Sequence, residues 1–433
     1  MLKLKNVLVS DPASGREEHT DIYIENGKIA EIGGFPGAEV SEEIDCRGLY
    51  AAPGFVDVHV HFRDPGQTAK EDIITCAAAG ARGGYTSLVG MANTVPAVSD
   101  VQTLRYVLDR GAKTGIHIYS AATLTLGMQG KEPVPMEELA EAGAACFTDD
   151  GRPVMDEALL RQAFIRAKAL NRVISLHEED PAFIGTPGVN AGEAAEALGL
   201  TGAQAKAEWS MVQRDLALAA ETGAAVDFQH ISAKESVELI REAVTEEADM
   251  PPGVISEKRR IHGEATPHHF TLTEQAVSRF GTLAKMNPPL RTREDREAII
   301  AGLKDNTLDI IATDHAPHTM TEKNRPFPEA PSGITGLETA FSLGITRLVR
   351  EGHLTMQEFL AKLTVNPARA YGLPAGVLAV GKAADIVIFD PDEKYTVSQF
   401  LSKASNSPFF GAELYGRIKM TISAGRPVWR SGL

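Results

Sequence analysis

The sequence predicts a TIM-type (β/α)8 barrel joined to a small β-sandwich domain that is built from both ends of the chain. Three observations support this α/β fold class. Eight short apolar runs recur through the middle of the chain, helix-like stretches lie between them, and strand-like patterns occupy both ends. Strands that alternate with helices are typical of parallel α/β folds, and a doubly wound sheet is the competing arrangement.

The two chain ends have the pattern of short strands. In residues 1–52, apolar and polar residues alternate in LKLKNVLV and DIYIENGKIAEIG, and Asn26-Gly27 is typical of a tight hairpin turn. Residues 369–433 return to this pattern in ADIVIFD, RIKMTISAG and RPVWRSG. We therefore expect these two segments to form the small β-domain together.

Residues 53–368 are expected to form the barrel. Its eight strand candidates are VDVHV, GYTSLVG, IHIYSA, AACFT, RVISLH, AVDFQH, GEATPHH and LDIIATD. Stretches such as MDEALLRQAFIRAKAL, and SMVQRDLALAAETG ending in Gly223, have helical periodicity. The segment 245–262 is charged, contains Pro251-Pro252 and has no clear period, so it predicts an exposed insertion or loop, to which we assign no function.

Composition and charge exclude several classes of protein. The 433 residues include 43 Lys and Arg against 58 Asp and Glu, a net charge of -15, and no basic block, which argues against a nucleic-acid partner. No segment approaches the roughly 18 apolar residues of a membrane span, and no signal peptide is recognisable, so a cytoplasmic protein is expected. Cys46, Cys76 and Cys146 are too scattered for a disulfide framework or a cysteine zinc site.

Histidine and aspartate residues repeatedly follow the apolar runs. In a barrel the catalytic groups come from these strand ends, where the loops build the active site. His59 and His61 lie two apart in the first run, so they point to the same face of a strand and can bind one metal ion. The other candidates at strand ends are Asp149 or Asp150, His177, His230 and Asp314.

Imidazole and carboxylate ligands without thiolate are typical of a Zn²⁺ site or of a similar divalent metal. Six candidates exceed what one tetrahedral ion with an open position requires, which favours two bridged ions. Four other histidines have different interpretations. We expect His117 to be a packed strand residue, His268 or His269 to line the site, and His315 to support it from behind.

Several motifs together resemble one family. GFVDVHVHFRDPGQ, GGYTS, FTDDG, TPHH, KMNPPLR, ATDHAPHT, GLETAF and GKAADIVIFD occur in order over nearly the whole chain. They closely resemble the dihydroorotases of the amidohydrolase superfamily, a group of metal-dependent hydrolases. FRDPG, KMNPPLR and DHAPHT favour dihydroorotase over hydantoinase, dihydropyrimidinase or allantoinase.

The resemblance implies a site with two zinc ions, although one ion per subunit is an alternative. The implied ligands are His59, His61 and Asp314 on one ion, and His177 and His230 on the other. Many relatives bridge the ions with a carboxylated lysine. Here FTDD lacks lysine and resembles the bacterial class I subgroup, in which the second aspartate, Asp150, is the ligand, and Asp149 is the weaker candidate.

The implied reaction is the reversible closure of N-carbamoyl-L-aspartate to L-dihydroorotate, the third step of pyrimidine synthesis. Asp314 is expected to carry the proton. The family pattern assigns Arg63, Asn93 and His318 to the substrate carboxylate, Asn287 to its ring and Gly333 to a loop beside it. The alternatives are another cyclic amidohydrolase, or a weakly active assembly partner of aspartate transcarbamoylase.

Three positions depart from the family pattern. Ala92 stands where proline is usual, Glu178 where a small residue or cysteine is common, and Ser332 where an aromatic residue is frequent. The first and third are expected to affect substrate affinity. A homodimer is usual in the family, and a complex with aspartate transcarbamoylase is a further expected partnership.

Overall fold

A computed structural model describes residues 1–37, 39–249 and 259–431 of the chain. Within these ranges, eight parallel strands form a barrel in two hydrogen-bonded groups, one of three strands and one of five. Bridges between Ala122 and Phe147, and between Val60 and His315, join the groups into a closed ring. The strands are β6 (Phe55–Val60), β7 (Tyr85–Gly90), β8 (His117–Ser120), β9 (Cys146–Phe147), β10 (Val173–Leu176), β11 (Val226–Phe228), β12 (Ile261–Ala265) and β13 (Ile310–Ile311).

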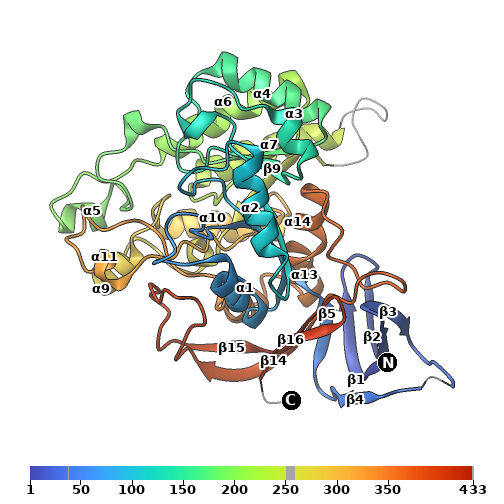
Figure 1. Ribbon diagram of the computed structural model, residues 1–433. Helices are drawn as coiled ribbons and strands as arrows, with labels where there is room; N and C mark the ends of the chain where they lie inside the picture. Colours follow the sequence, from blue (N-terminus) through green and yellow to red (C-terminus); the bar gives the residue numbers. More distant parts are fainter. Residues whose placement is uncertain (38, 250–258, 432–433) are drawn as a thin grey trace.

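The expected barrel is therefore confirmed, and each predicted run contributes its strand. The helices between the strands pack around the barrel (Figure 1), and apolar side chains from both form one large core. The longer helices are α1 (Ile73–Arg82), α2 (Val101–Gly111), α4 (Glu157–Ala169), α6 (Lys206–Thr222), α7 (Lys234–Asp249), α10 (Arg293–Lys304) and α13 (Met356–Leu363). The shorter ones are α3 (Met136–Glu141), α5 (Glu193–Ala197), α8 (Pro267–Thr271), α9 (Ala276–Phe280), α11 (Met320–Lys323), α12 (Ala340–Gly344), α14 (Val365–Ala370), η1 (Leu126–Met128), η2 (Pro181–Phe183), η3 (Gly281–Ala284) and η4 (Ile345–Val349).

Local signals define where the helices begin and end. Asp72 caps α1 by accepting hydrogen bonds from the N–H groups of Ile74 and Thr75, and Thr75 completes the capping box. Helix α6 ends, as predicted, at Gly223, whose φ of 69° is in the left-handed region that glycine adopts without steric cost.

Both ends of the chain supply a separate sheet beside the barrel (Figure 1). Its strands are β1 (Leu2–Asp11), β2 (Arg16–Glu25), β3 (Lys28–Ile32), β4 (Glu42–Asp45), β5 (Tyr50–Pro53), β14 (Ile386–Thr396), β15 (Glu413–Ser423) and β16 (Arg426–Arg430). Asn26 and Gly27, with φ of 50° and 81°, form the expected turn between β2 and β3. Strand β14 pairs with β5 on one side and with β15 on the other, and a second apolar core includes residues from both ends.

The segment 245–262 differs from the expected loop. Its first residues continue helix α7 to Asp249, and its last two belong to strand β12, while 250–258 lie outside the described residues. Glu247 on the helix pairs with the guanidinium of Arg260 at 2.9 Å just before the strand begins. The ion pair links the two elements, so helix and strand extend further into this charged segment than the sequence pattern indicated.

The seventh predicted strand is shorter than its apolar run. Strand β12 ends at Ala265, and Thr266 then caps helix α8 by accepting a hydrogen bond from the N–H of His269. Thr followed by Pro is a helix-start signal that the strand interpretation overlooked. His268 and His269 are therefore helical rather than strand residues.

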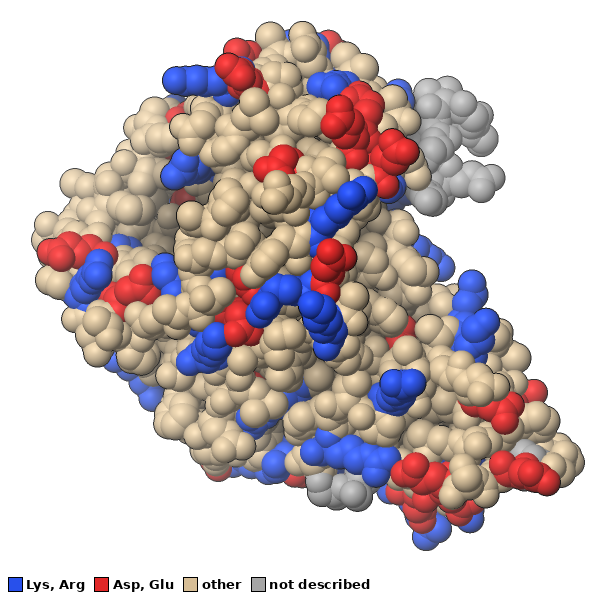
Figure 2. Space-filling model, viewed as in Figure 1, with Lys and Arg blue, Asp and Glu red and all other residues tan. Residues whose placement is uncertain are grey.

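The three cysteines lie in the interior, and charged side chains of both signs lie on the surface. Cys46, Cys76 and Cys146 are buried free thiols. On the face drawn in Figure 2, basic and acidic side chains lie interspersed. Within 1–37, 39–249 and 259–431, no helix combines the length and apolar character that crossing a membrane requires.

Candidate active site

A cavity of about 160 Å³ opens at the carboxyl ends of the barrel strands. This is the end of a barrel where loops following the strands build active sites. The cavity brings together most of the residues selected from the sequence. Its lining is His61, Arg63, Asn93, Asp150, Gly151, His177, His230, Asn287, Asp314, Ala316, Ser332 and Gly333.

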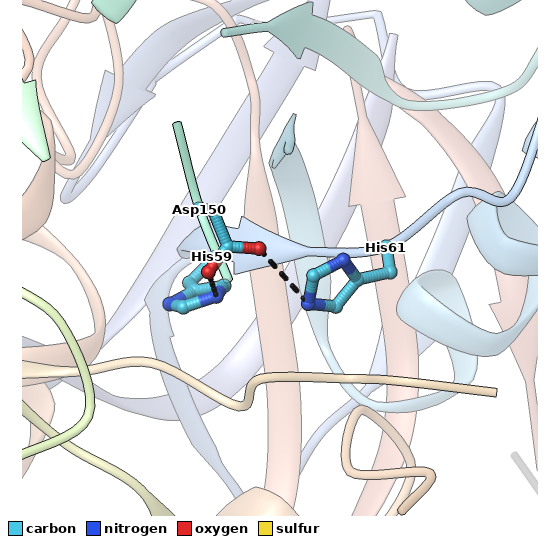
Figure 3. Close-up of side chains that lie close together, drawn as sticks. All are labelled: His59, His61 and Asp150. Atoms are coloured by element: carbon cyan, nitrogen blue, oxygen red, sulfur yellow. Dashed lines mark ion pairs between the residues drawn. The ribbon is translucent and has the colours of Figure 1, made fainter. Parts of the chain in front are cut away.

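The first group of metal-binding side chains is His59, His61 and Asp150. Their ligand atoms all lie within 4.8 Å of one another, and all three residues are buried. Oδ1 of Asp150 lies 3.8 Å from Nε2 of His59, and Oδ2 lies 3.7 Å from Nε2 of His61 (Figure 3). His59 lies in strand β6 and His61 directly follows its last residue, and both imidazoles face Asp150, as the spacing of two residues predicted.

The second group shares Asp150 with the first and adds His177 and His230. Nδ1 of His177 lies 3.4 Å from Oδ1 of Asp150 and 2.9 Å from Nε2 of His230. One carboxylate thus faces both groups, which is the arrangement of a bridging ligand. Asp149 has a different environment, because its carboxylate accepts hydrogen bonds from the N–H groups of Leu124 and Thr125.

Asp314 lies at the edge of the first group. Its Oδ1 is 3.0 Å from Nε2 of His61 and 3.6 Å from Nε2 of His59. Asp314, His230 and Arg63 have φ angles of 46°, 35° and 57°, in the left-handed region that non-glycine residues seldom occupy. Such strain costs about 1–3 kcal/mol per residue and tends to gather at functional sites. Here the three residues follow strands β13, β11 and β6, respectively, and all three line the cavity.

Glu264 is a functional residue that the sequence analysis did not select. Its Oε2 lies 2.9 Å from Nδ1 of His59 and accepts a hydrogen bond from the N–H of His230 at 3.1 Å. A carboxylate on the outer nitrogen of a histidine orients the ring and leaves its other nitrogen for a metal ion. The sequence did contain a signal for this residue, because a glutamate lies in the middle of the buried run GEATPHH. A charge inside a barrel is costly unless it has a partner, so this glutamate could have been expected to contact another polar group.

The electrostatics of these groups suit a cation. Burial opposes the charged form of His59, but the carboxylates of Glu264, Asp314 and Asp150 outweigh it and raise the pKa of His59 to about 10. Burial and the charges of His177 and His59 hold the pKa of His230 well below its usual range. Nε2 of His59 is buried without a hydrogen-bond partner among the described residues. An unpartnered ring nitrogen beside two carboxylates fits a bound metal ion.

A cationic region adjoins these groups at the cavity. Arg63 donates from Nε to the carbonyl of Pro317 at 3.3 Å, and its Nη2 lies 3.4 Å from Nε2 of His318. His318 is buried and is not among the residues that line the cavity, but it contacts Arg63 and its Cδ2 lies close to Gly333, both of which line it. Burial, together with the charges of Arg63, Lys70 and Lys323, lowers the pKa of His318 to about 2, so its ring is neutral.

Two amide side chains complete the cavity. Asn93 accepts from Nδ1 of His61 at 3.0 Å, and its Nδ2 donates to Oδ2 of Asp150 at 2.8 Å and to the carbonyl of the same residue at 3.5 Å, so it links two members of the first group. Oδ1 of Asn287 accepts a hydrogen bond from the hydroxyl of Ser332 at 3.0 Å. Ser332, one of the departures from the family pattern, therefore orients a residue expected to contact substrate.

Gly333 is restrained from three directions. Its φ is 125°, and a Cβ atom there would lie 2.7 Å from Cβ of Ala316. Its N–H donates to the carbonyl of Lys285, and its own carbonyl accepts from Nζ of Lys323 and from Nδ2 of Asn406, both at 3.0 Å. Only glycine fits this position without strain.

Asn406 is a second residue that the sequence analysis missed. Besides its bond to Gly333, its Nδ2 donates to the carbonyl of Ala316 at 3.2 Å, and its Oδ1 accepts from the N–H of His318 at 3.0 Å. This fully buried amide joins two cavity loops to the C-terminal segment. No motif surrounds it, so only the three-dimensional fold reveals its position.

The remaining selected residues lie away from the cavity. His117 is a strand residue, as expected, and begins β8, but its side chain is partly exposed and its Nε2 pairs with Asp385 at 3.0 Å instead of packing in the core. His315 is buried behind Asp314, with Nε2 3.5 Å from Oε2 of Glu71. His269 bonds to Thr266 and to the carbonyl of Pro288 rather than facing the cavity. The other two departures, Ala92 and Glu178, are buried outside the cavity lining.

Comparisons with known proteins show which family the chain belongs to. Residues 50–428 match the amidohydrolase family. The dihydroorotase of Clostridioides difficile is 50% identical over 432 residues and covers 100% of both chains. That of Clostridium acetobutylicum is also 50% identical over 432 residues, with 99% of each chain covered. The dihydroorotase of Lactococcus lactis is 48% identical over 431 residues and again covers 99% of each chain.

Solved structures show the same fold at lower identity. L-Hydantoinase (dihydropyrimidinase) from Arthrobacter aurescens superposes with a TM-score of 0.87 and 24% identity, covering 100% of this chain and 96% of that one. Dihydropyrimidinase from Brevibacillus agri gives a TM-score of 0.84 and 23% identity, covering 99% and 95%. At 23–24% identity, this similarity shows a shared fold and nothing more.

Proposed function

The chain belongs to the amidohydrolase family, with dihydroorotases as its full-length relatives, and we propose that it catalyses the reversible cyclisation of N-carbamoyl-L-aspartate to L-dihydroorotate. The observation that carries this proposal is the cavity itself. Two groups of metal-binding side chains share Asp150, and Arg63 lines the same cavity. A cyclic amide that carries a carboxylate needs both the metal-binding groups and the guanidinium.

We propose Zn²⁺ as the resident metal, with two ions per subunit. His59, His61 and Asp314 would hold one ion, His177 and His230 the other, and Asp150 both. Histidine nitrogens and carboxylate oxygens without thiolate are a donor set that zinc accepts. When bound, a pair of such ions polarises the ring carbonyl and lowers the pKa of the attacking water.

The chain's own residues supply proton transfer. In the hydrolytic direction, the carboxylate of Asp314 accepts a proton from the attacking water and delivers it to the ring nitrogen that leaves. Its position beside Nε2 of His61 keeps it at the edge of the first group, facing the cavity. In the biosynthetic direction, Asp314 accepts the proton of the attacking amide nitrogen.

Substrate orientation rests on the cationic side of the cavity. The planar guanidinium of Arg63 suits a bidentate pair with the substrate carboxylate, and the family pattern places Asn93 and His318 beside the same carboxylate. Asn287, held by Ser332, faces the position of the ring. The partial burial of Arg63 strengthens its attraction for an anion, because water screens it less than at an exposed site.

The test is an assay of the purified protein with dihydroorotate, hydantoin and allantoin, with metal content measured on the same sample. We expect turnover of dihydroorotate well above that of the two uncharged rings, loss of activity on chelation and recovery with Zn²⁺. A fully metallated sample that leaves dihydroorotate unchanged would contradict the proposal. Preference for hydantoin or allantoin would instead favour another cyclic amidohydrolase.

A further inference from the structure

The two nitrogens of His318 face two different cations. Nζ of Lys70 lies 3.4 Å from Nδ1, and Nη2 of Arg63 lies 3.4 Å from Nε2. Lys70 is itself held by Oε1 of Glu322 at 3.1 Å. The imidazole therefore lies between a lysine on its outer edge and an arginine on its cavity edge.

The cavity edge of the ring is identified by a second contact. Cδ2, the carbon next to Nε2, would lie 3.3 Å from a Cβ atom at Gly333, and both Gly333 and Arg63 line the cavity. Nδ1 faces the other way, toward Lys70 and Glu322, whose Oε2 lies 3.9 Å from it. A substrate carboxylate bound to Arg63 would meet Nε2 and not Nδ1.

A neutral imidazole carries one N–H and one accepting nitrogen, whereas lysine and arginine only donate. The ring also faces the backbone carbonyl of Ser332, which only accepts. His318 can therefore accept from one of its two cationic neighbours and carries its N–H on the other nitrogen. If Nε2 accepted from Arg63, it would present a lone pair to the substrate carboxylate and repel it. If Nδ1 accepts from Lys70, Nε2 carries the proton and donates to the carboxylate.

We propose that Lys70 is a positioning residue that selects the Nε2–H tautomer of His318 and so makes this ring a donor to the anionic substrate. Glu322 keeps the ammonium of Lys70 beside Nδ1. The backbone N–H of His318 is held separately, by a hydrogen bond to Asn406. The role in catalysis rests on the proposed function, but the tautomer is a property of the protein without substrate.

The tautomer is measured by ¹⁵N NMR of the metal-loaded, full-length protein labelled at histidine nitrogens. The signals of His318 are assigned as those absent from the His318→Gln variant. We expect a protonated Nε2 in the wild type and in Lys70→Arg, which keeps a donor. In Lys70→Met we expect a substantial shift of the proton to Nδ1. An unchanged Nε2–H signal in Lys70→Met would overturn the proposal.

Kinetics provide the second measurement. Loss of a hydrogen bond to the substrate carboxylate should raise KM for dihydroorotate roughly ten- to hundredfold in Lys70→Met, with kcat changed by less than about threefold. Lys70→Arg should recover most of the loss. The matched control is Lys403→Met, which removes another positive charge that bonds to Asp72 and to the carbonyl of Thr68 instead of to His318.

The two measurements separate the possible failures. Equal increases of KM in Lys70→Met and Lys403→Met would show a general effect of charge and overturn the proposal. If dihydroorotate is not a substrate at all, the proposed function fails, yet the NMR comparison of the wild type and Lys70→Met still decides whether Lys70 selects the tautomer.

Discussion

Nδ1 of His59 lies 2.9 Å from Oε2 of Glu264, and neither side chain is exposed to solvent. The same oxygen accepts the N–H of His230 at 3.1 Å. A single carboxylate oxygen thus contacts one member of each group of metal-binding side chains. The orientation of the His59 ring and the backbone position of His230 both depend on this contact.

Glu264→Gln is expected to weaken metal binding about 10- to 100-fold, the range typical of lost partners behind metal-ligating histidines. The amide removes the negative charge that orients His59. Metal content after competition with a chelator measures the effect. Glu274→Gln is the matched control, because it changes another buried carboxylate, which accepts from Asn190 at 2.9 Å. Equal metal loss in both variants would argue against a specific role for Glu264.

Asp150→Asn and Asp149→Asn should have opposite consequences although the residues are adjacent. Asp150 faces both groups, so its variant should bind less metal per subunit. Asp149 accepts the N–H groups of Leu124 and Thr125, so its variant should retain metal but lose about 1–3 kcal/mol of stability. Elemental analysis and thermal unfolding distinguish them. Metal loss in Asp149→Asn alone would reverse the assignment of the ligand.

Asp314→Asn should reduce kcat by about 10²- to 10⁴-fold, the usual contribution of general acid–base catalysis. The amide keeps the shape of the side chain but cannot accept and return the proton. Calorimetric binding of dihydroorotate, on samples matched for metal content, should change much less than kcat. Equal losses in binding and turnover would count against proton transfer by Asp314.

Arg63→Lys should raise KM for dihydroorotate by about tenfold or more with a smaller effect on kcat. Lysine keeps the positive charge but cannot form the bidentate pair with a carboxylate, nor the same bond to the carbonyl of Pro317. Steady-state kinetics at constant ionic strength provide the measurement. An unchanged KM would mean that the charge of Arg63 suffices without its geometry.

Lys323 predicts a pH dependence of stability. Burial lowers the pKa of this lysine to about 7 in the folded protein, from 10.5 for an ordinary lysine. Between these values the unfolded chain binds more protons, so the free-energy cost of burying this lysine falls as pH rises, and stability increases by up to about 1.4 kcal/mol per pH unit. Urea unfolding at pH 6 to 9 should show the wild type gaining stability relative to Lys323→Met. A constant difference would contradict this prediction.

Much of the barrel and its metal-binding groups could be predicted because the relevant signals are local. The alternation of His59 and His61 directs both rings inward from one strand, and His177, His230 and Asp314 each follow a run of apolar residues. The parallel barrel gathers these strand ends at one edge, so local patterns sufficed. The seventh run showed the limit, since Thr266 and Pro267 begin a helix inside a stretch that had been assigned to a strand.

The contacts that orient the site could not be predicted in the same way. Glu264 reaches His59 across 205 positions of sequence, and Asn406 reaches His318 across 88. Their side chains meet only because the barrel closes and the C-terminal segment returns to it. Lys70 and Lys323 likewise look like ordinary surface residues in the sequence, and only burial and contact distances reveal their partners.

The position of Asn406 also has a consequence for how the protein is made. This amide joins the loops around Ala316, His318 and Gly333, yet it follows every strand of the barrel in the chain. During synthesis the barrel strands and their metal-binding groups are therefore made before Asn406, and the loops on the substrate side gain this restraint only after the whole barrel has been translated. A nascent or prematurely terminated chain would then present metal-binding groups before it could hold its substrate.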